Sequence, residues 1–275
     1  MKFIPILALC LHPLVSCSPI QATSPVLVKT GSASKLSPVQ KKKIGNKIWK
    51  NESGGSVTGL TTWNKGEEFP SMGIGHFIWY PRGFNGRWTE SFPDFVRYAQ
   101  ASGRKDIPAW VLQANDCPWN SKAAFEADFN GAQLSGLRAF LASSVTLQTD
   151  FIIQKSQEAL PKILKVAPAA DQQRIQTNYH LVATTTNGTY SLIDYVNFKG
   201  EGINPRERYG NQGWGLLQVL SNMRPSKGGQ DSARAFADSA KFTLKQRIKN
   251  SPAERGEKRW KAGWDNRCET YSKAF

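Results

Sequence analysis

The chain has 275 residues, 40% of them hydrophobic and 11% aromatic, and its 36 Lys and Arg against 21 Asp and Glu give a formal net charge of +15. This length and apolar content suffice for a substantial buried core, which excludes an intrinsically disordered protein. The excess of positive charge predicts an anionic partner without identifying it.

The first 16 residues have the pattern of an export signal. Lys2 precedes an apolar run over residues 3–15, which is too short and too interrupted for a membrane span. The run ends in a lipobox-like LVSC sequence, so we expect lipidation of Cys17, with ordinary cleavage after Ala22 as the alternative. The predicted location is therefore the periplasm or the outer membrane as an anchored lipoprotein, or alternatively the medium as a secreted protein.

Residues 17–36 read as a flexible linker, because they are rich in Ser, Thr and Pro and lack periodicity. A helix follows it directly. Ser37 is the expected N-cap, Pro38 takes the first helical position, and Gln40 at the third position completes a capping box.

Glu52 is the residue of chemical interest in this helix. Ile44, Ile48 and Glu52 follow at four-residue steps, so the carboxyl group continues an apolar stripe and is expected to point inward. Gly54 and Gly55 end the helix. Burial beside apolar groups with no cation would favour the neutral acid, which can protonate a leaving group. The alternative is an ordinary acid at a frayed helix end.

Residues 57–80 predict a small antiparallel hairpin, because Thr, Trp, Phe, Ile and Gly are dense there and a turn sequence lies at 64–66. Ser71 precedes the run Gly73-Ile74-Gly75-His76, where glycines allow another backbone or a ligand to come close.

Beyond the hairpin, apolar spacing predicts helices over 92–101, 121–141, 149–166, 168–183, 189–197, 213–223 and 230–249. A last helix is expected after the cap-like Ser251-Pro252, running through Trp260 and Trp264. The predicted fold class is α+β, mainly α.

Two cysteines, Cys117 and Cys268, remain after any processing of the signal. In an oxidising compartment a disulfide between them is expected, with two buried free thiols as the alternative. The three histidines, His12, His76 and His180, have no metal-binding spacing, so we expect no metal and no cofactor.

Glu52 at a helix end, followed by a hairpin with Ser71 and the Gly-Ile-Gly-His run, resembles the active site of the phage-type lysozymes. In that family a catalytic glutamate closes the first helix, and the hairpin carries a carboxylate, a Thr and a similar Gly-x-Gly-His run. Ser71 stands at the position of the Thr, five residues before His76.

The resemblance extends to later segments and covers about half of the mature chain. Residues 191–202 resemble the central helix of the family, 214–220 the short helix after it, and 254–260 the basic final helix. The resemblance implies a lysozyme-like domain over 37–275, with a small β-hairpin lobe, a larger helical lobe and an inserted helical region at about 80–170.

The chain departs from the family at the second carboxylate. The family places it six residues before the Thr, where this chain has Lys65, with Asn64 beside it. An inverting glycosidase needs a base about 6.5–9.5 Å from its acid. Glu67 and Glu68 are the nearby replacements, and strand parity favours Glu67 because it would share a face with Ser71.

The implied activity is cleavage of the glycan strand of peptidoglycan by a muramidase. Glu52 is then the general acid, Ser71 holds a water or a substrate hydroxyl, and Glu67 is the partner carboxylate. The expected substrate-binding residues are Trp63, Asn64, Glu68, His76, Glu201 and Gln218.

Two alternatives to the muramidase stay open. A lytic transglycosylase would use one glutamate alone, and Glu201 in the sequence EGINP resembles the catalytic block of soluble lytic transglycosylases, with Gln218 in a block that resembles their GLMQ. Gln218 would otherwise be a buried amide that satisfies backbone groups. A non-catalytic peptidoglycan-binding or envelope protein on the same scaffold is the third reading. The expected partner is peptidoglycan, with membrane contact through the lipid anchor only and no nucleic acid.

Overall fold

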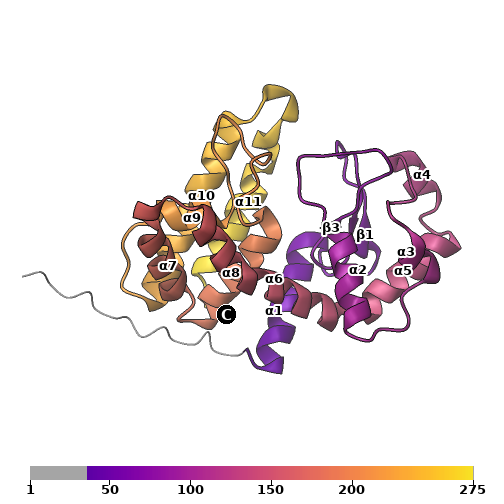
Figure 1. Ribbon diagram of the computed structural model, residues 1–275, viewed down its shortest axis with the longest axis horizontal. Helices are drawn as coiled ribbons and strands as arrows, with labels where there is room; N and C mark the ends of the chain where they lie inside the picture. Colours follow the sequence, from indigo (N-terminus) through magenta and orange to yellow (C-terminus); the bar gives the residue numbers. More distant parts are fainter. Residues whose placement is uncertain (1–35, 275) are drawn as a thin grey trace, which may run out of the picture. The chain divides into compact units, whose positions relative to one another are not determined.

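The structure is a computed structural model that describes residues 36–274 (Figure 1). The expected signal peptide, the lipidation site Cys17 and the linker up to residue 35 lie outside these residues. The described chain is mainly helical with one small antiparallel sheet, so the predicted α+β, mainly α class is confirmed. None of its helices is both long and apolar enough to span a membrane.

The first helix, α1 (Pro38–Ser53), has the predicted capping box. The Ser37 side chain accepts a hydrogen bond from the Gln40 N–H at 3.2 Å, and the Gln40 side chain accepts one from the Ser37 N–H at 2.8 Å. Gly54 ends the helix in the left-handed conformation, with φ of 66°. Glu52 therefore lies in the last turn.

The sheet consists of three two-residue strands, β1 (Thr61–Thr62), β2 (Ser71–Met72) and β3 (Phe77–Ile78), in the order β1-β2-β3. Ser71 pairs with Thr62 on one side and with Ile78 on the other. The turn between β2 and β3 needs positive φ at Gly73 (76°) and at His76 (47°).

Four helices lie beside the sheet: α2 (Phe92–Ala101), α3 (Ala109–Gln113), α4 (Lys122–Ala127) and α5 (Ala132–Ser143). We call the sheet and these helices the hairpin lobe. The helix predicted over 121–141 is two helices, because the chain turns over 128–131 and Gly131 becomes the N-cap of α5. The short helix α3 was not predicted.

The long helix α6 (Val145–Val166) packs against α1, α2 and α8, and lies between the two groups of helices in Figure 1. It falls within the range expected as an insertion, yet it forms part of the central framework. The remaining helices, which we call the helical lobe, are α7 (Ala169–Val182), α8 (Thr186–Lys199), α9 (Leu216–Asn222), α10 (Gly229–Asn250) and α11 (Lys261–Glu269).

The expected last helix is interrupted at its start. Two 3₁₀ turns, Ala253–Arg255 and Glu257–Trp260, precede α11, and Gly256 between them has φ of 56°, which a continuous helix cannot include. Two further 3₁₀ turns lie at Thr58–Leu60 and Thr270–Ser272.

The predicted disulfide is wrong, because both cysteines are free and buried. Cys117 lies in the hairpin lobe, where its N–H donates to the Tyr80 carbonyl at 2.8 Å and its thiol to the Trp119 carbonyl at 3.6 Å. Cys268 lies on α11 of the helical lobe. The two thiols belong to different parts of the core.

Candidate active site

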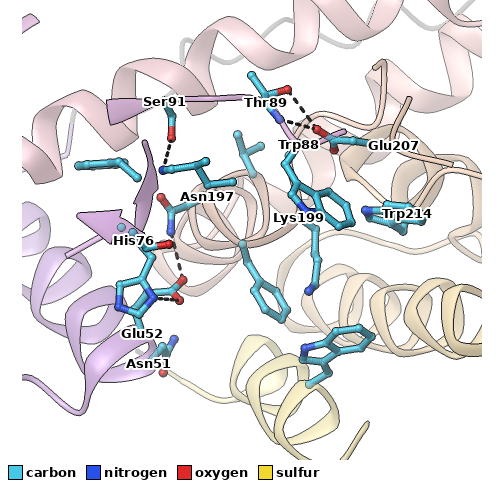
Figure 2. Close-up of a pocket in the computed structure, with 18 of the residues that line it drawn as sticks. Asn51, Glu52, His76, Trp88, Thr89, Ser91, Asn197, Lys199, Glu207 and Trp214 are labelled. Atoms are coloured by element: carbon cyan, nitrogen blue, oxygen red, sulfur yellow. Dashed lines mark hydrogen bonds and ion pairs between the residues drawn. The ribbon is translucent and has the colours of Figure 1, made fainter. Parts of the chain in front are cut away.

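A cleft of about 1470 Å³ is lined by residues of both lobes. The hairpin lobe contributes the loop 64–67, Ser71 and His76, and the helical lobe contributes side chains from α8 and from the segment 255–270. Glu52 lines the cleft from the end of α1 (Figure 2).

The Glu52 side chain is 14% exposed and its two oxygens have different neighbours. Oε1 accepts hydrogen bonds from Arg267 Nη2 at 2.7 Å and from Asn197 Nδ2 at 3.3 Å. Oε2 lies 3.7 Å from His76 Nδ1. Oε1 thus accepts two donors, whereas Oε2 faces the imidazole of His76.

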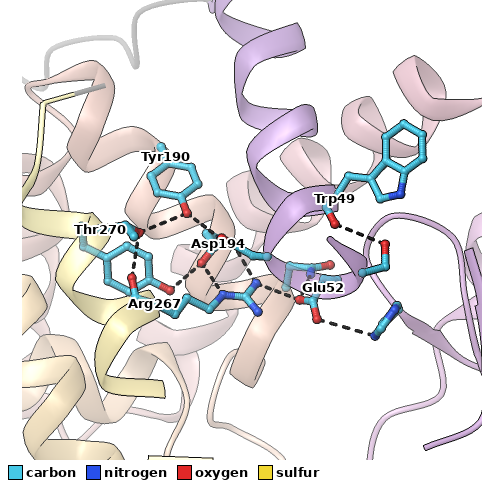
Figure 3. Close-up of polar contacts among 11 residues, drawn as sticks. Trp49, Glu52, Tyr190, Asp194, Arg267 and Thr270 are labelled. Carbon is cyan, nitrogen blue, oxygen red and sulfur yellow. Dashed lines mark hydrogen bonds and ion pairs between the residues drawn. The ribbon is translucent and has the colours of Figure 1, made fainter. Parts of the chain in front are cut away.

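Arg267 joins Glu52 to a second, fully buried carboxylate (Figure 3). Its Nε and Nη2 donate to Asp194 at 2.8 and 2.9 Å, and the Asp194 side chain is 0% exposed. Burial opposes the charge on the guanidinium, but Asp194 and Glu52 outweigh it and raise the pKa of Arg267 well above its ordinary value. The expectation that Glu52 has no cation beside it is therefore wrong.

Two more residues fix Asp194 in place. The Tyr271 hydroxyl donates to it at 2.6 Å, and the Asn51 amide, one residue before Glu52, donates at 3.3 Å. Sequence reasoning missed Asp194, Arg267 and Asn197 as site residues. No local spacing marks them, because they meet Glu52 only through contacts between distant segments.

His76 and Ser71 stand on the hairpin side of the cleft. His76 adopts φ of 47°, and its Nε2 is buried without a hydrogen-bond partner. Strain of this kind persists where the surrounding structure enforces it. Ser71 is 5% exposed and lines the cleft, and its hydroxyl forms no hydrogen bond with another residue of the described part of the chain. That hydroxyl is free for a water or a substrate.

Glu67 lines the cleft from the turn that begins at Asn64. The Asn64 amide donates to Glu67 Oε2 at 3.0 Å. Burial raises the pKa of Glu67, although Asn64 and the charge of His76 act in the opposite direction. Lys65 lies in the same loop and also lines the cleft. Glu67 is the carboxylate that this loop contributes to the cleft.

Three predicted substrate-binding residues do not line the cleft. Trp63 is 5% exposed and packs edge-on against Phe125 in the core of the hairpin lobe. Glu68 is exposed to solvent and does not line the cleft. Gln218 accepts a hydrogen bond from the Gly215 N–H and donates to the Gly202 carbonyl, so its amide satisfies backbone groups.

Glu201, the alternative acid, also lines the cleft. Lys162 Nζ contacts its Oε1 at 2.9 Å, and the Glu201 side chain is 17% exposed. Glu201 thus stands with an ammonium partner, whereas Glu52 has a guanidinium, an amide and an imidazole around it. Within residues 36–274 no three His, Cys, Asp or Glu side chains gather in a group that could hold a metal ion.

Comparisons with known proteins give no match, whether with family models, with curated proteins or with solved structures.

Proposed function

We propose that this protein cleaves the glycan strand of peptidoglycan, with a lysozyme-like fold and Glu52 as its general acid. One observation carries the proposal: the Glu52 carboxyl faces a large cleft at a helix end, opposite a hairpin that presents Ser71 and Glu67 to the same cleft. A general acid needs this placement because it must reach the glycosidic oxygen of a bound strand.

In this mechanism Glu52 Oε2 protonates the leaving oxygen while Arg267 and Asn197 hold Oε1. The guanidinium fixes the direction of the carboxyl plane, which keeps the proton aimed into the cleft. Glu67 would accept a proton from the attacking water, with Ser71 holding that water in place. The buried environment of Glu67, which raises its pKa, also suits a group that exchanges a proton.

Lytic transglycosylation is the second candidate, and Lys65 favours it, because a lysine stands where the lysozyme family has its second carboxylate. In that reaction Glu52 acts as acid and then as base, and no water is activated. The product then carries an anhydro-muramyl end instead of a reducing end.

The test uses Glu52→Gln on purified cell-wall sacculi. Removing a general acid is expected to lower the rate of glycan release roughly 10²–10⁴-fold while the fold, followed by circular dichroism, is retained. Glu68→Gln is the matched control, because it is exposed outside the cleft, and it should keep full activity. Full activity in Glu52→Gln would overturn the assignment.

Glu67→Gln separates the two mechanisms. Hydrolysis predicts reducing ends in the products and a large loss of activity in this variant. Transglycosylation predicts anhydro ends and little change. Sacculi that bind the unmodified chain without any release of soluble fragments would instead indicate a non-catalytic wall-binding protein.

A further inference from the structure

The two walls of the cleft touch each other where two loops meet. Residues 85–89 lie between β3 and α2 in the hairpin lobe, and residues 204–207 lie between α8 and α9 in the helical lobe. Both loops contribute residues to the lining of the cleft. Figure 2 shows Thr89 of the first loop bonded to Glu207 of the second. We call these two loops together the strap.

Glu207 is the residue that joins the two loops. Its Oε1 accepts hydrogen bonds from the Thr89 N–H at 3.0 Å, from the Thr89 hydroxyl at 3.1 Å and from the Asn204 amide at 3.2 Å. Glu207 is only 9% exposed. Hydrogen bonds to a carboxylate are among the stronger ones in proteins, so we expect the strap to stay closed.

Further contacts of two kinds extend the strap. Arg206 donates to the Asn85 side chain at 2.8 Å and to the Asn85 carbonyl at 3.0 Å. The Trp88 ring lies 5.8 Å from that of Trp214, which is 1% exposed. The strap therefore combines polar and aromatic contacts, and its aromatic part is fixed in the core of the helical lobe.

The walls also approach each other at the tip of the hairpin. A Cβ added to Gly66 would lie 3.7 Å from a guanidinium nitrogen of Arg259, in the segment that leads into α11. In the described part of the chain no hydrogen bond joins these two residues. The walls can therefore separate at the hairpin tip, whereas hydrogen bonds hold them together at the strap.

The strap restricts how a polymer can enter the cleft. Donors and acceptors about 3 Å apart leave no room for a sugar chain between the two loops. A glycan strand in the cleft must therefore end at the strap or pass between the strap and the helices α6 and α8, which also line the cleft. In both cases a free end of the strand has to enter first.

We propose that the strap makes this protein act on the ends of glycan strands and release short products from them, instead of cutting within a strand. The inference rests on the proposed function, since it takes the ligand to be a wall glycan, and it adds the class of substrate, which is a free strand end. Glu207 is the positioning residue of the strap, because it acts through Thr89 and Asn204.

The first test follows product length while the unmodified chain digests long, peptide-free glycan strands. Entry by an end predicts short products from the start, while the remaining strands stay near their full length. Cleavage within strands predicts a rapid fall in mean length before short products accumulate. At equal glycan mass, shorter starting strands should also be digested faster, because they offer more ends. Size-exclusion chromatography measures both effects.

Glu207→Ala is expected to open the strap, because it removes the acceptor that the Thr89 N–H and hydroxyl share. Strands could then enter sideways, so the early products should shift from short to long. Arg208→Ala is the matched control, since the neighbouring Arg208 is exposed and does not line the cleft, and its products should stay short. Circular dichroism checks that each variant is folded.

A covalent lock tests the strap even if Glu207→Ala does not fold. Asn85→Cys and Arg206→Cys, at two exposed positions, can be joined by a short bis-maleimide, while the native Cys117 and Cys268 are buried away from the reagent. The locked chain should release the same short products as the double variant before cross-linking, and at a similar rate.

Long early fragments from the unmodified chain would overturn the proposal and leave the proposed function standing. So would short products from a folded Glu207→Ala, and so would loss of glycan release on locking, since the strap would then have to open in each turnover. If the unmodified chain releases no glycan from strands or from sacculi, the proposed function itself fails, and entry by strand ends fails with it.

Discussion

Arg267 holds the proposed acid in place through a single nitrogen, because its Nη2 contacts both Glu52 Oε1 and Asp194 Oδ1. The guanidinium is 8% exposed and Asp194 fully buried, so the pair is rigid and its hydrogen bonds are not shared with solvent. A carboxyl group at a helix end would otherwise move with the fraying last turn. Asp194 thus positions Glu52 without touching the cleft.

Asp194→Asn tests this role. Neutralising one partner of a buried pair is expected to cost about 3–5 kcal/mol of unfolding free energy, because the Arg267 charge loses its buried counter-ion. Arg267 would then have Glu52 as its carboxylate partner and draw it away from the cleft, so wall lysis should fall as well. Urea unfolding and release of soluble glycan measure the two effects.

Tyr271→Phe is the milder companion variant, because it removes one hydrogen bond to Asp194 and keeps the charge pair. It should cost about 1–3 kcal/mol and leave most of the activity. If Asp194→Asn proved as stable and as active as the unmodified chain, the positioning role would be refuted.

At the scale of single residues, the sequence predicts the site residues that have a local signal and misses those that lack one. Glu52, Ser71 and Glu67 are found because a helix end and a hairpin lie close together in the chain, and all three line the cleft. Arg267 contacts Glu52 across 215 positions, and no periodicity encodes such a pairing.

Among the elements, α6 holds the hairpin turn through one buried amide. Gln148 Oε1 accepts from the Ile74 N–H at 2.8 Å, and its Nε2 donates to the Leu141 carbonyl at 2.6 Å and to the Ser144 hydroxyl at 3.1 Å. A Cβ on Gly73 would lie 2.2 Å from Gln148 Oε1, so glycine is required there. The same turn carries His76 towards Glu52.

Gln148→Leu should therefore destabilise the chain by about 1–3 kcal/mol, because it leaves the Ile74 N–H buried without its partner. Amide hydrogen exchange at Ile74 should accelerate as the turn loosens. Gln154→Leu, at an exposed position of the same helix, is the control and should change stability little. Slow exchange at Ile74 in Gln148→Leu would contradict this account.

Elements with strong local signals were predicted closely. The capping box placed the start of α1, and the expected helix 92–101 matches α2. Predictions failed where a local break interrupts an apolar pattern, as at Gly131 between α4 and α5 and at Gly256 before α11. The spacing of apolar residues stays helical on both sides of a short break, so this spacing alone does not reveal the break.

For the molecule as a whole, α1 and α6 lie between the hairpin lobe and the helical lobe, and both lobes contribute walls of the cleft (Figure 1). The two thiols report on different parts of the core, because Cys117 is buried in one lobe and Cys268 in the other.

The state of the thiols yields a direct test. Burial raises the pKa of Cys117 and of Cys268 to about 12 each, so neither is a thiolate near neutral pH, and the thiolate is the form that reacts. Iodoacetamide should leave both residues unmodified in the folded chain and alkylate both after denaturation, with or without prior reduction. Peptide mapping of the two sites measures this.

A chain joined by a disulfide would behave differently once it is denatured or reduced. Its denatured form would be alkylated only after reduction, a non-reduced digest would contain a peptide linking residues 117 and 268, and a reducing agent would lower its unfolding midpoint. The free-thiol arrangement predicts the same midpoint with and without reductant. Rapid alkylation of Cys268 alone in the folded chain would instead contradict the burial of this thiol, because α11, which carries Arg267, would have to move away from Asp194 to expose it.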